Sequence, residues 1–379
     1  MSRRGSIATF AVLVAAIALG IYAGTAALSQ PPPSAGPSLA LASPPTPRPT
    51  PNPSPTTAPD GLSVFPLGPI PTDSRIIVTG DPGDERLLLL DVANKRVRLL
   101  GHFSGFGNYK DARLIELTTN SSGDLLVVCL HADGPLARLY FIRPSGGDVR
   151  SFTIPNSENP RLSPDGATLA VSRNTIADQK GLWLLSTSDG TGRRITTDAG
   201  RRATRAIQWS ADGTRLSALI DHLDLTRELV IVGVDGSVSA PLGPATDARW
   251  RGEDLVFWNN ALPGPVSLYH AGAVTVTYAS PPDVRITRAE LKPRSKDLVL
   301  GQSTSTTIPK IVLYDSTAGT TSVVFPDSTW VLSFWWSTDA TRLYAWILDN
   351  DTSHIRDAIT GEAILDFCFR AKVDPPCGG

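Results

Sequence analysis

A short polar turn recurs along most of this chain, and its spacing constrains the fold more than any other feature. The clearest copies read SPDG, SADG and STDA, and the others are degenerate. The copies begin at Thr72, Ser121, Ser163, Ser210, Arg251, Arg294 and Ser337. Successive copies are 41 to 49 residues apart, which is the period of a four-stranded β-propeller blade.

The sequence around each turn follows the pattern of short antiparallel strands. An apolar run such as TLAV follows the turn, and a second hairpin such as GLWLLSTSDGTGRRIT completes the unit. Long helical periodicity does not occur after residue 60. We therefore predict an all-β propeller of about seven four-stranded blades, or six or eight if the degenerate first or fifth unit is misassigned. Asp and Gly serve such turns through side-chain hydrogen bonds and positive φ, so we expect the recurring Asp to be structural.

The N-terminus carries a membrane signal. Residues 7–28 contain no charge, and as a helix they would rise about 33 Å, enough to cross a bilayer core. Arg3 and Arg4 predict that residues 1–6 are cytoplasmic and that the rest of the chain is outside. We predict a transmembrane signal-anchor. A cleaved signal peptide stays open, because Ala27-Leu28-Ser29 fits a small-x-small cleavage site, and the protein would then be secreted.

Proline dominates the segment that follows. Twelve residues of the segment 29–60 are proline, and proline fixes φ and removes a backbone donor. We predict a disordered, extended Pro/Ser/Thr-rich linker here. The propeller is then expected at residues 61–370, and a C-terminal tail at 371–379.

Charge and cysteine content exclude several classes of function. The formal net charge of −1 argues against a nucleic-acid partner. Cys129 lies in an apolar run and is expected to be buried. Cys368 and Cys377 could pair outside the cell or remain free thiols. Gly-rich phosphate loops, CxxC pairs and a GxSxG elbow are absent from the sequence, so we predict no cofactor and no serine-hydrolase site.

Long polar connections between the second and third strands of the units should share one face of the propeller, and we expect this face to be the working surface. Three histidines lie in or beside these connections, each with acidic neighbours. The candidate metal ligands are His131, Asp133, Asp221, His222, Asp224, Asp349, Asp351 and His354. They belong to units two, four and seven, so separate solvated side chains are the alternative.

Two further groups of residues could take part in binding: a basic run and a set of tryptophans in equivalent positions of the units. A basic run could bind an anionic glycan, a lipid headgroup or a protein, or it could be a solvated surface. It consists of Arg193, Arg194, Arg201, Arg202 and Arg205. Trp209, Trp250 and Trp336 share the position just before the turn. We expect them to pack between blades, with ligand stacking as the alternative.

The segment RLSPDGATLAVS…LWLLSTSDGTGRRIT resembles the repeat of TolB-type, WD40-like propellers, with the best match over residues 159–242. The resemblance implies the fold but says little about activity, because such propellers host many functions. Related repeats also form the gate of prolyl-oligopeptidase-type peptidases, whose hydrolase domain carries the GxSxG elbow that this sequence lacks.

Together these features predict a bacterial, membrane-tethered and extracytoplasmic propeller that binds a protein or an envelope polymer as a non-enzymatic module or scaffold. No catalytic residue is predicted. The alternative is a propeller enzyme of the lyase, lactonase or glycosidase type, with histidines and carboxylates converging at the channel mouth.

Overall fold

The computed structural model describes residues 56–57, 62–68, 70–71, 73–81, 84–103, 113–131, 136–145, 148–155, 157–173, 180–197, 201–304, 310–325, 330–349 and 352–368. The chain divides into two units, Met1–Pro51 and Asn52–Gly379, and every described element belongs to the second. The predicted membrane segment lies outside the described residues, as do most of the linker and the tail. None of the described residues forms a helix suited to crossing a membrane.

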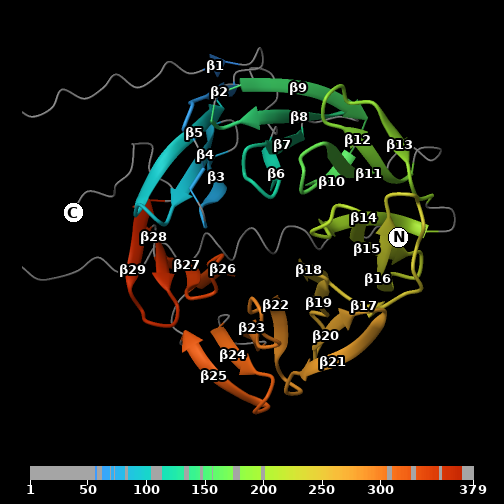
Figure 1. Cartoon of the computed structure of the whole chain (residues 1–379), viewed down its shortest axis with the longest axis vertical. Coiled ribbons are helices and arrows are strands. Elements are labelled where there is room, and N and C mark those ends of the chain that lie inside the picture. Colours follow the sequence, from blue (N-terminus) through green and yellow to red (C-terminus); the bar gives the residue numbers. More distant parts are fainter. Residues whose placement is uncertain are drawn as a thin grey trace, which may run out of the picture. The chain divides into compact units, whose positions relative to one another are not determined.

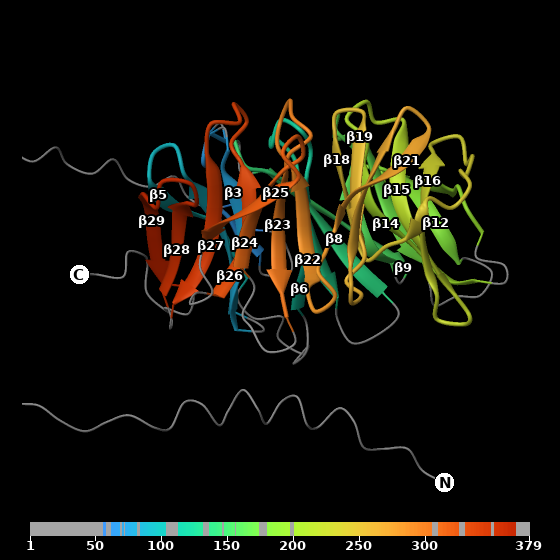
Figure 2. The same ribbon diagram turned by 90° about the horizontal axis from the view of Figure 1, so that it is seen from below.

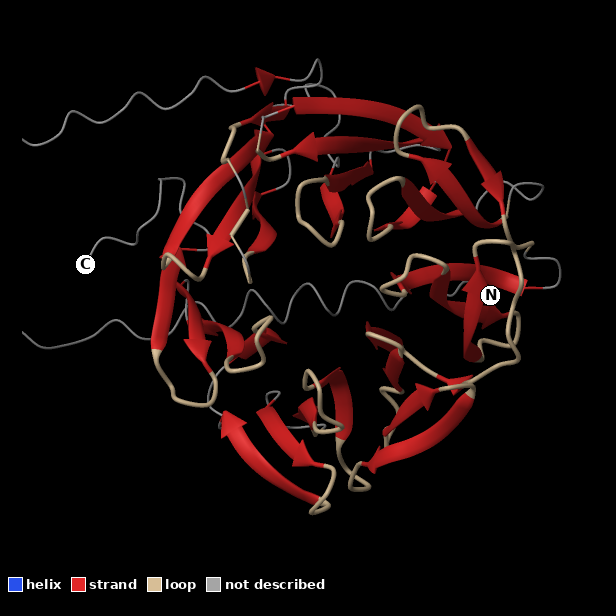
Figure 3. Ribbon diagram, viewed as in Figure 1, coloured by secondary structure: helices blue, strands red, loops and turns tan. Residues whose placement is uncertain are grey.

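Seven antiparallel sheets stand around a common axis (Figure 1). The secondary structure in the described part is strand and turn (Figure 3). This arrangement confirms the predicted seven-bladed, all-β propeller.

Blades 2 to 7 are four-stranded meanders whose strands follow one another in chain order across the sheet. Blade 2 contains β6 (Arg113–Thr119), β7 (Leu126–His131), β8 (Leu136–Arg143) and β9 (Asp148–Pro155). Blade 3 contains β10 (Ser157–Leu162), β11 (Thr168–Arg173), β12 (Gly181–Ser186) and β13 (Gly192–Arg194). Blade 4 contains β14 (Arg201–Trp209), β15 (Arg215–His222), β16 (Arg227–Gly233) and β17 (Gly243–Pro244). Blade 5 contains β18 (Asp247–Arg251), β19 (Asp254–Trp258), β20 (Pro265–His270) and β21 (Ala273–Ala279). Blade 6 contains β22 (Arg285–Leu291), β23 (Leu298–Ser303), β24 (Lys310–Asp315) and β25 (Thr320–Phe325). Blade 7 contains β26 (Trp330–Trp336), β27 (Leu343–Asp349), β28 (Thr352–Asp357) and β29 (Ala363–Cys368).

The first of these strands lies nearest the axis in each blade, and the strands run between the two ends of the ring (Figure 2). Because the strands alternate in direction, the tight turns after the first and third strands share one end. The longer connections after the second strand lie at the other end.

Blade 1 is assembled differently. Its strands β3 (Arg75–Asp81), β4 (Asp84–Asp91) and β5 (Arg96–Phe103) follow the chain, but the next strand of the sheet is supplied by an earlier segment. That strand is β2 (Leu62–Val64), which pairs antiparallel with β5 and carries β1 (Thr56–Thr57) on its outer side. The short β1 therefore falls within the segment predicted to be linker. Since blade 7 is built entirely from the C-terminal end of the chain, the first and last blades share no strand among those described.

Apolar clusters fill the space between neighbouring blades. Leu62 and Phe103 of blade 1, for example, pack with Leu126 and Tyr140 of blade 2, and all four side chains are fully buried. Burying one such side chain contributes about 1.5 to 3 kcal/mol. A single blade cannot cover both of its faces, so the ring is stable only when each blade has two neighbours.

The ring closes through contacts between blades 1 and 7. Leu90 of β4 belongs to the same buried cluster as Trp335 and Tyr344 of blade 7. The backbone N–H of Thr338 donates to Asp73 Oδ1 over 2.7 Å, and the Thr338 hydroxyl donates to the same oxygen.

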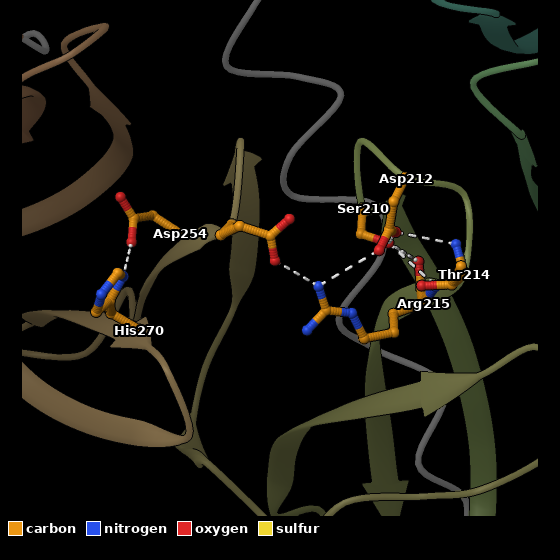
Figure 4. A network of polar contacts seen from close by, with 7 residues as sticks. Ser210, Asp212, Thr214, Arg215, Asp254 and His270 are labelled. Atoms are coloured by element: carbon orange, nitrogen blue, oxygen red, sulfur yellow. Dashed lines mark hydrogen bonds and ion pairs between the residues drawn. The ribbon is translucent and has the colours of Figure 1, made fainter.

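The recurring turns have the structural role expected for them (Figure 4). Ser210 Oγ donates to Asp212 Oδ1 over 2.5 Å, and the same oxygen accepts from the backbone N–H of Thr214 over 3.0 Å. Ser210 Oγ also accepts from the backbone N–H of Arg215. These hydrogen bonds, led by the one from Ser210, lower the pKa of Asp212 to about 2. The turns at Ser163 and Ser337 repeat the pattern.

Candidate functional site

A cavity of about 590 Å³ lies on the axis of the ring. The inner strands of blades 2 to 6 line it near the ends that lead into the tight turns, and blade 1 contributes the first residue of β3. Its charged lining consists of Arg75, Arg161, Arg249, Arg251, Arg288 and Glu290. Five guanidinium groups thus face one carboxylate in a protein whose net charge is −1. A cleft lined by one sign of charge concentrates ligands of the opposite sign.

Strand alternation places these arginines at the channel. Arg249 and Arg251 flank Trp250 on β18, and successive side chains of a strand point to opposite faces. Trp250 is 7% exposed and packs between blades 4 and 5, so the two arginines lie away from that core. Trp209 and Trp336 are also buried in inter-blade clusters, which confirms the packing role expected for the three tryptophans.

Three of the arginines are held by local contacts. Arg288 Nη2 lies 2.5 Å from Glu290 Oε1, and Arg249 Nη2 lies 3.2 Å from Asp247 Oδ2. Arg161 donates to the backbone carbonyl oxygens of its own strand and of β14. These contacts fix the guanidinium groups without neutralising all of them.

Arg75 and Arg251 have no ion-pair partner among the residues the structure describes. The Arg75 guanidinium lies 5.2 Å from the centroid of the Trp335 ring, and its side chain is exposed to the channel. Desolvation by the surrounding ring lowers the pKa of Arg75; the charges of Arg288 and Arg251 act in the same direction, and Glu290 opposes them. Arginine nonetheless remains protonated in proteins. Blades 1 and 5 therefore bring unneutralised positive charge to the channel, beside the Arg288–Glu290 pair of blade 6.

A second cavity, of about 440 Å³, adjoins the first at the tight-turn end. The two share Leu117, Arg161, Gln208 and Trp250. Arg161 is the only charged residue among the described ones that line this second cavity. Its other lining residues include Thr119, Ser121, Pro164, Ala211 and Gly252. We call the first cavity the channel and the second cavity the turn groove. Together they form a continuous depression that runs from the axis across the turns of blades 2 to 5.

The candidate metal ligands are distributed over separate blades. In blade 4, Asp221 pairs with Arg205 and Arg227, and His222 Nε2 lies 3.0 Å from Glu228 Oε2. Asp224 caps its own turn by accepting from Thr226.

In blade 7, His354 Nδ1 lies 2.7 Å from Asp366 Oδ1. Asp133, Asp351 and the side chains of His131 and Asp349 lie outside what the structure describes. Within the described part, no three His, Cys, Asp or Glu side chains gather closely enough to hold a metal. The metal site stays a prediction.

The basic run is spread over blades 3 and 4. Arg193 and Arg194 are exposed and donate to the backbone carbonyls of Val234 and Lys180, whereas Arg205 pairs with Asp221. The side chains of Arg201 and Arg202 are not among those described. Their role in partner binding also stays a prediction.

The structure describes Cys129 but not both members of the possible pair Cys368 and Cys377. Cys129 is buried, as expected. Cys377 lies outside the described residues, so its pairing with Cys368 is untested.

The arginines of the channel were not singled out from the sequence. The signal that could have revealed them is the placement of Arg at alternate positions of short inner strands, as in DARWR of β18. The cavities also lie at the tight-turn end, opposite the long connections that we expected to form the working face.

Comparison with known proteins identifies the fold and leaves the function open. No family model matches the chain, and no curated protein matches it. Among solved structures, the chain is similar to the propeller domain of the Trilobed protease from Pyrococcus furiosus, with 14% identity, a TM-score of 0.52 and coverage of 68% of this chain and 82% of that one. It is also similar to oligogalacturonate lyase from Vibrio parahaemolyticus, with 11% identity, a TM-score of 0.53 and coverage of 80% and 87%.

TolB from Acinetobacter baumannii matches at 16% identity with a TM-score of 0.43 and coverage of 76% of each chain. The similarities to the protease propeller domain and to oligogalacturonate lyase show that the chain shares the β-propeller fold, and at such low identity they show the fold alone.

Proposed function

We propose that this protein is a non-enzymatic binding module that takes an anionic ligand into the axial channel and is held outside the membrane by its N-terminal segment. The observation that carries the proposal is the arginine-rich lining of the channel. Guanidinium groups bind carboxylate and phosphate oxygens through paired, charge-assisted hydrogen bonds.

The composition of the channel favours binding over catalysis. None of the described residues that line it is a histidine, and its one carboxylate, Glu290, is paired with Arg288. General acid–base chemistry needs a proton donor and a proton acceptor within reach of the substrate. The histidines with described ring contacts lie in blades 4, 5 and 7, and each is paired with a single carboxylate.

The test is direct binding of an anion to the full-length chain in detergent. Inorganic tripolyphosphate should bind saturably, and its affinity should fall with rising salt because exposed charges are screened. Arg251→Ala should weaken binding at least about tenfold, as expected for losing one charge-assisted contact of the stronger kind. Arg285→Ala, which removes an exposed arginine of β22 outside the cavities, is the matched control. Absence of saturable binding, or equal effects of the two substitutions, would refute the proposal.

The extracytoplasmic location has its own test. A protease added to intact spheroplasts should digest the propeller while a tag before residue 7 stays protected. Protection of the propeller would contradict the predicted topology.

A further inference from the structure

The channel and the turn groove differ in charge, and this difference constrains the shape of the ligand. The channel carries five arginines, whereas the described lining of the turn groove is otherwise uncharged. A ligand that occupies both must place its negative charge at one end.

Ionised carboxylates stand beside the groove and strengthen this constraint. Asp165 follows Pro164, and Asp212 follows Ala211, so both turn carboxylates adjoin lining residues. Hydrogen bonds from Ser163 and Ser210 lower the pKa of each, so both are charged at neutral pH. A polymer with charges repeated along its length would meet repulsion here, because like charges across an interface are unfavourable.

The shape of the depression favours an extended chain. The groove follows the turns of blades 2 to 5 and joins the channel through the four shared residues. Its surface offers small polar groups such as Thr119 and Ser121, and the two tryptophans that line it, Trp209 and Trp250, are at least nine-tenths buried. Such a surface suits a peptide backbone better than sugar rings, which bind by stacking on open aromatic faces. Capture of a terminal carboxylate is an established mode of peptide recognition.

From this geometry, and resting on the proposed function, we infer that the ligand is the carboxy-terminal tail of a partner protein. Its acidic end lies in the channel among Arg75, Arg251 and Arg288, and its preceding neutral residues lie along the turn groove. The site is thus directional, with the last residue nearest the axis.

The experiment measures fluorescence anisotropy of labelled ten-residue peptides with the full-length chain. The test peptide consists of Gly, Ser, Thr and Asn and ends in Asp-Glu with a free carboxylate. A second peptide has the same sequence with a C-terminal amide, and a third carries Asp-Glu at an acetylated N-terminus and ends in an amide. We expect the free acid to bind most tightly and each change to weaken binding at least about fivefold, since each removes or displaces charge-assisted contacts.

Two matched pairs of variants locate the peptide. Arg251→Ala should weaken binding of the free-acid peptide at least about tenfold, and Arg285→Ala should weaken it less than about twofold. Ala211→Trp fills the turn groove and should also weaken binding of the free-acid peptide. Its matched control is Ala318→Trp, which makes the same change on an exposed turn of blade 6 outside the cavities. Thermal melting of each variant checks that it is folded.

The outcomes separate this inference from the proposed function. If tripolyphosphate or polyglutamate binds in an Arg251-dependent manner while the three peptides bind equally or Ala211→Trp has no effect, the inference is wrong and the anion site stands. The same holds if an acidic oligosaccharide binds and the peptides do not. If no anion binds, both are wrong.

Discussion

Replacing Leu62 by alanine tests whether the three-residue strand β2 completes blade 1. The Leu62 side chain is fully buried and packs with Leu87, Leu100 and Phe103 of its own blade and with Leu126 of blade 2. Truncating a fully buried leucine removes its transfer free energy and leaves a cavity, which together cost about 3 kcal/mol or more. For roughly 300 ordered residues the entropy of unfolding at the midpoint is about 0.6 kcal/mol per kelvin, so the melting temperature should fall by about 5 °C.

The assay is thermal unfolding of the full-length chain followed by circular dichroism. The control is Leu223→Ala, an identical truncation of a side chain that is 70% exposed, and it should shift the midpoint by less than about 1 °C. Equal midpoints for the two variants would show that β2 is not packed against β5 in solution and would refute this account of blade 1.

Two other predictions address turns and close packing. The carboxylates of Asp212 and Asp339 have their pKa lowered to about 2 from 3.8, so the stability they contribute is present above about pH 4 and is lost as the pH falls towards 2. Urea unfolding at pH 4, 3 and 2 should therefore show that the free energy of unfolding falls less on acidification in the double variant D212N/D339N than in the parent chain. An equal fall in both proteins would contradict the turn geometry. Gly181 has φ +135°, and a Cβ there would lie 2.1 Å from the Thr196 carbonyl oxygen, whereas Gly272 has φ +87° with open space around it. Gly181→Ala should cost about 2 to 4 kcal/mol and Gly272→Ala about 1 kcal/mol, because only the first adds a backbone clash to the strain of positive φ; comparable midpoints in denaturant would disprove this.

The blades were predictable because their information is local. The Ser-x-Asp-Gly turn, as at Ser163 and Ser210, carries its own hydrogen bonds within a few residues, and its period fixes the architecture. The closure of the ring was not predictable in the same way. β2 has no turn signature of its own, and its partner β5 lies beyond two further strands. Pairing of this kind depends on the assembled fold.

The channel could not be assembled from local patterns either. Arg75, Arg251 and Arg288 come from three blades, and they converge only when the ring has closed. Each arginine alone is compatible with a solvated strand end. The buried tryptophans, by contrast, were assigned correctly because their position before the turn repeats in several units.

The attachment of β2 to blade 1 has a mechanical consequence. If the preceding segment is a tether, tension in it reaches the ring first at β1 and then at β2. The contact of β2 with β5 spans three residue pairs, and β2 contributes the buried Leu62 and Val64. β5 is bonded to β4, and β4 to β3, which begins with Arg75 in the channel. Traction on such a tether would therefore act first on the blade that supplies Arg75 to the channel, and it would reach the arginines of blades 3, 5 and 6 only through the packing between blades.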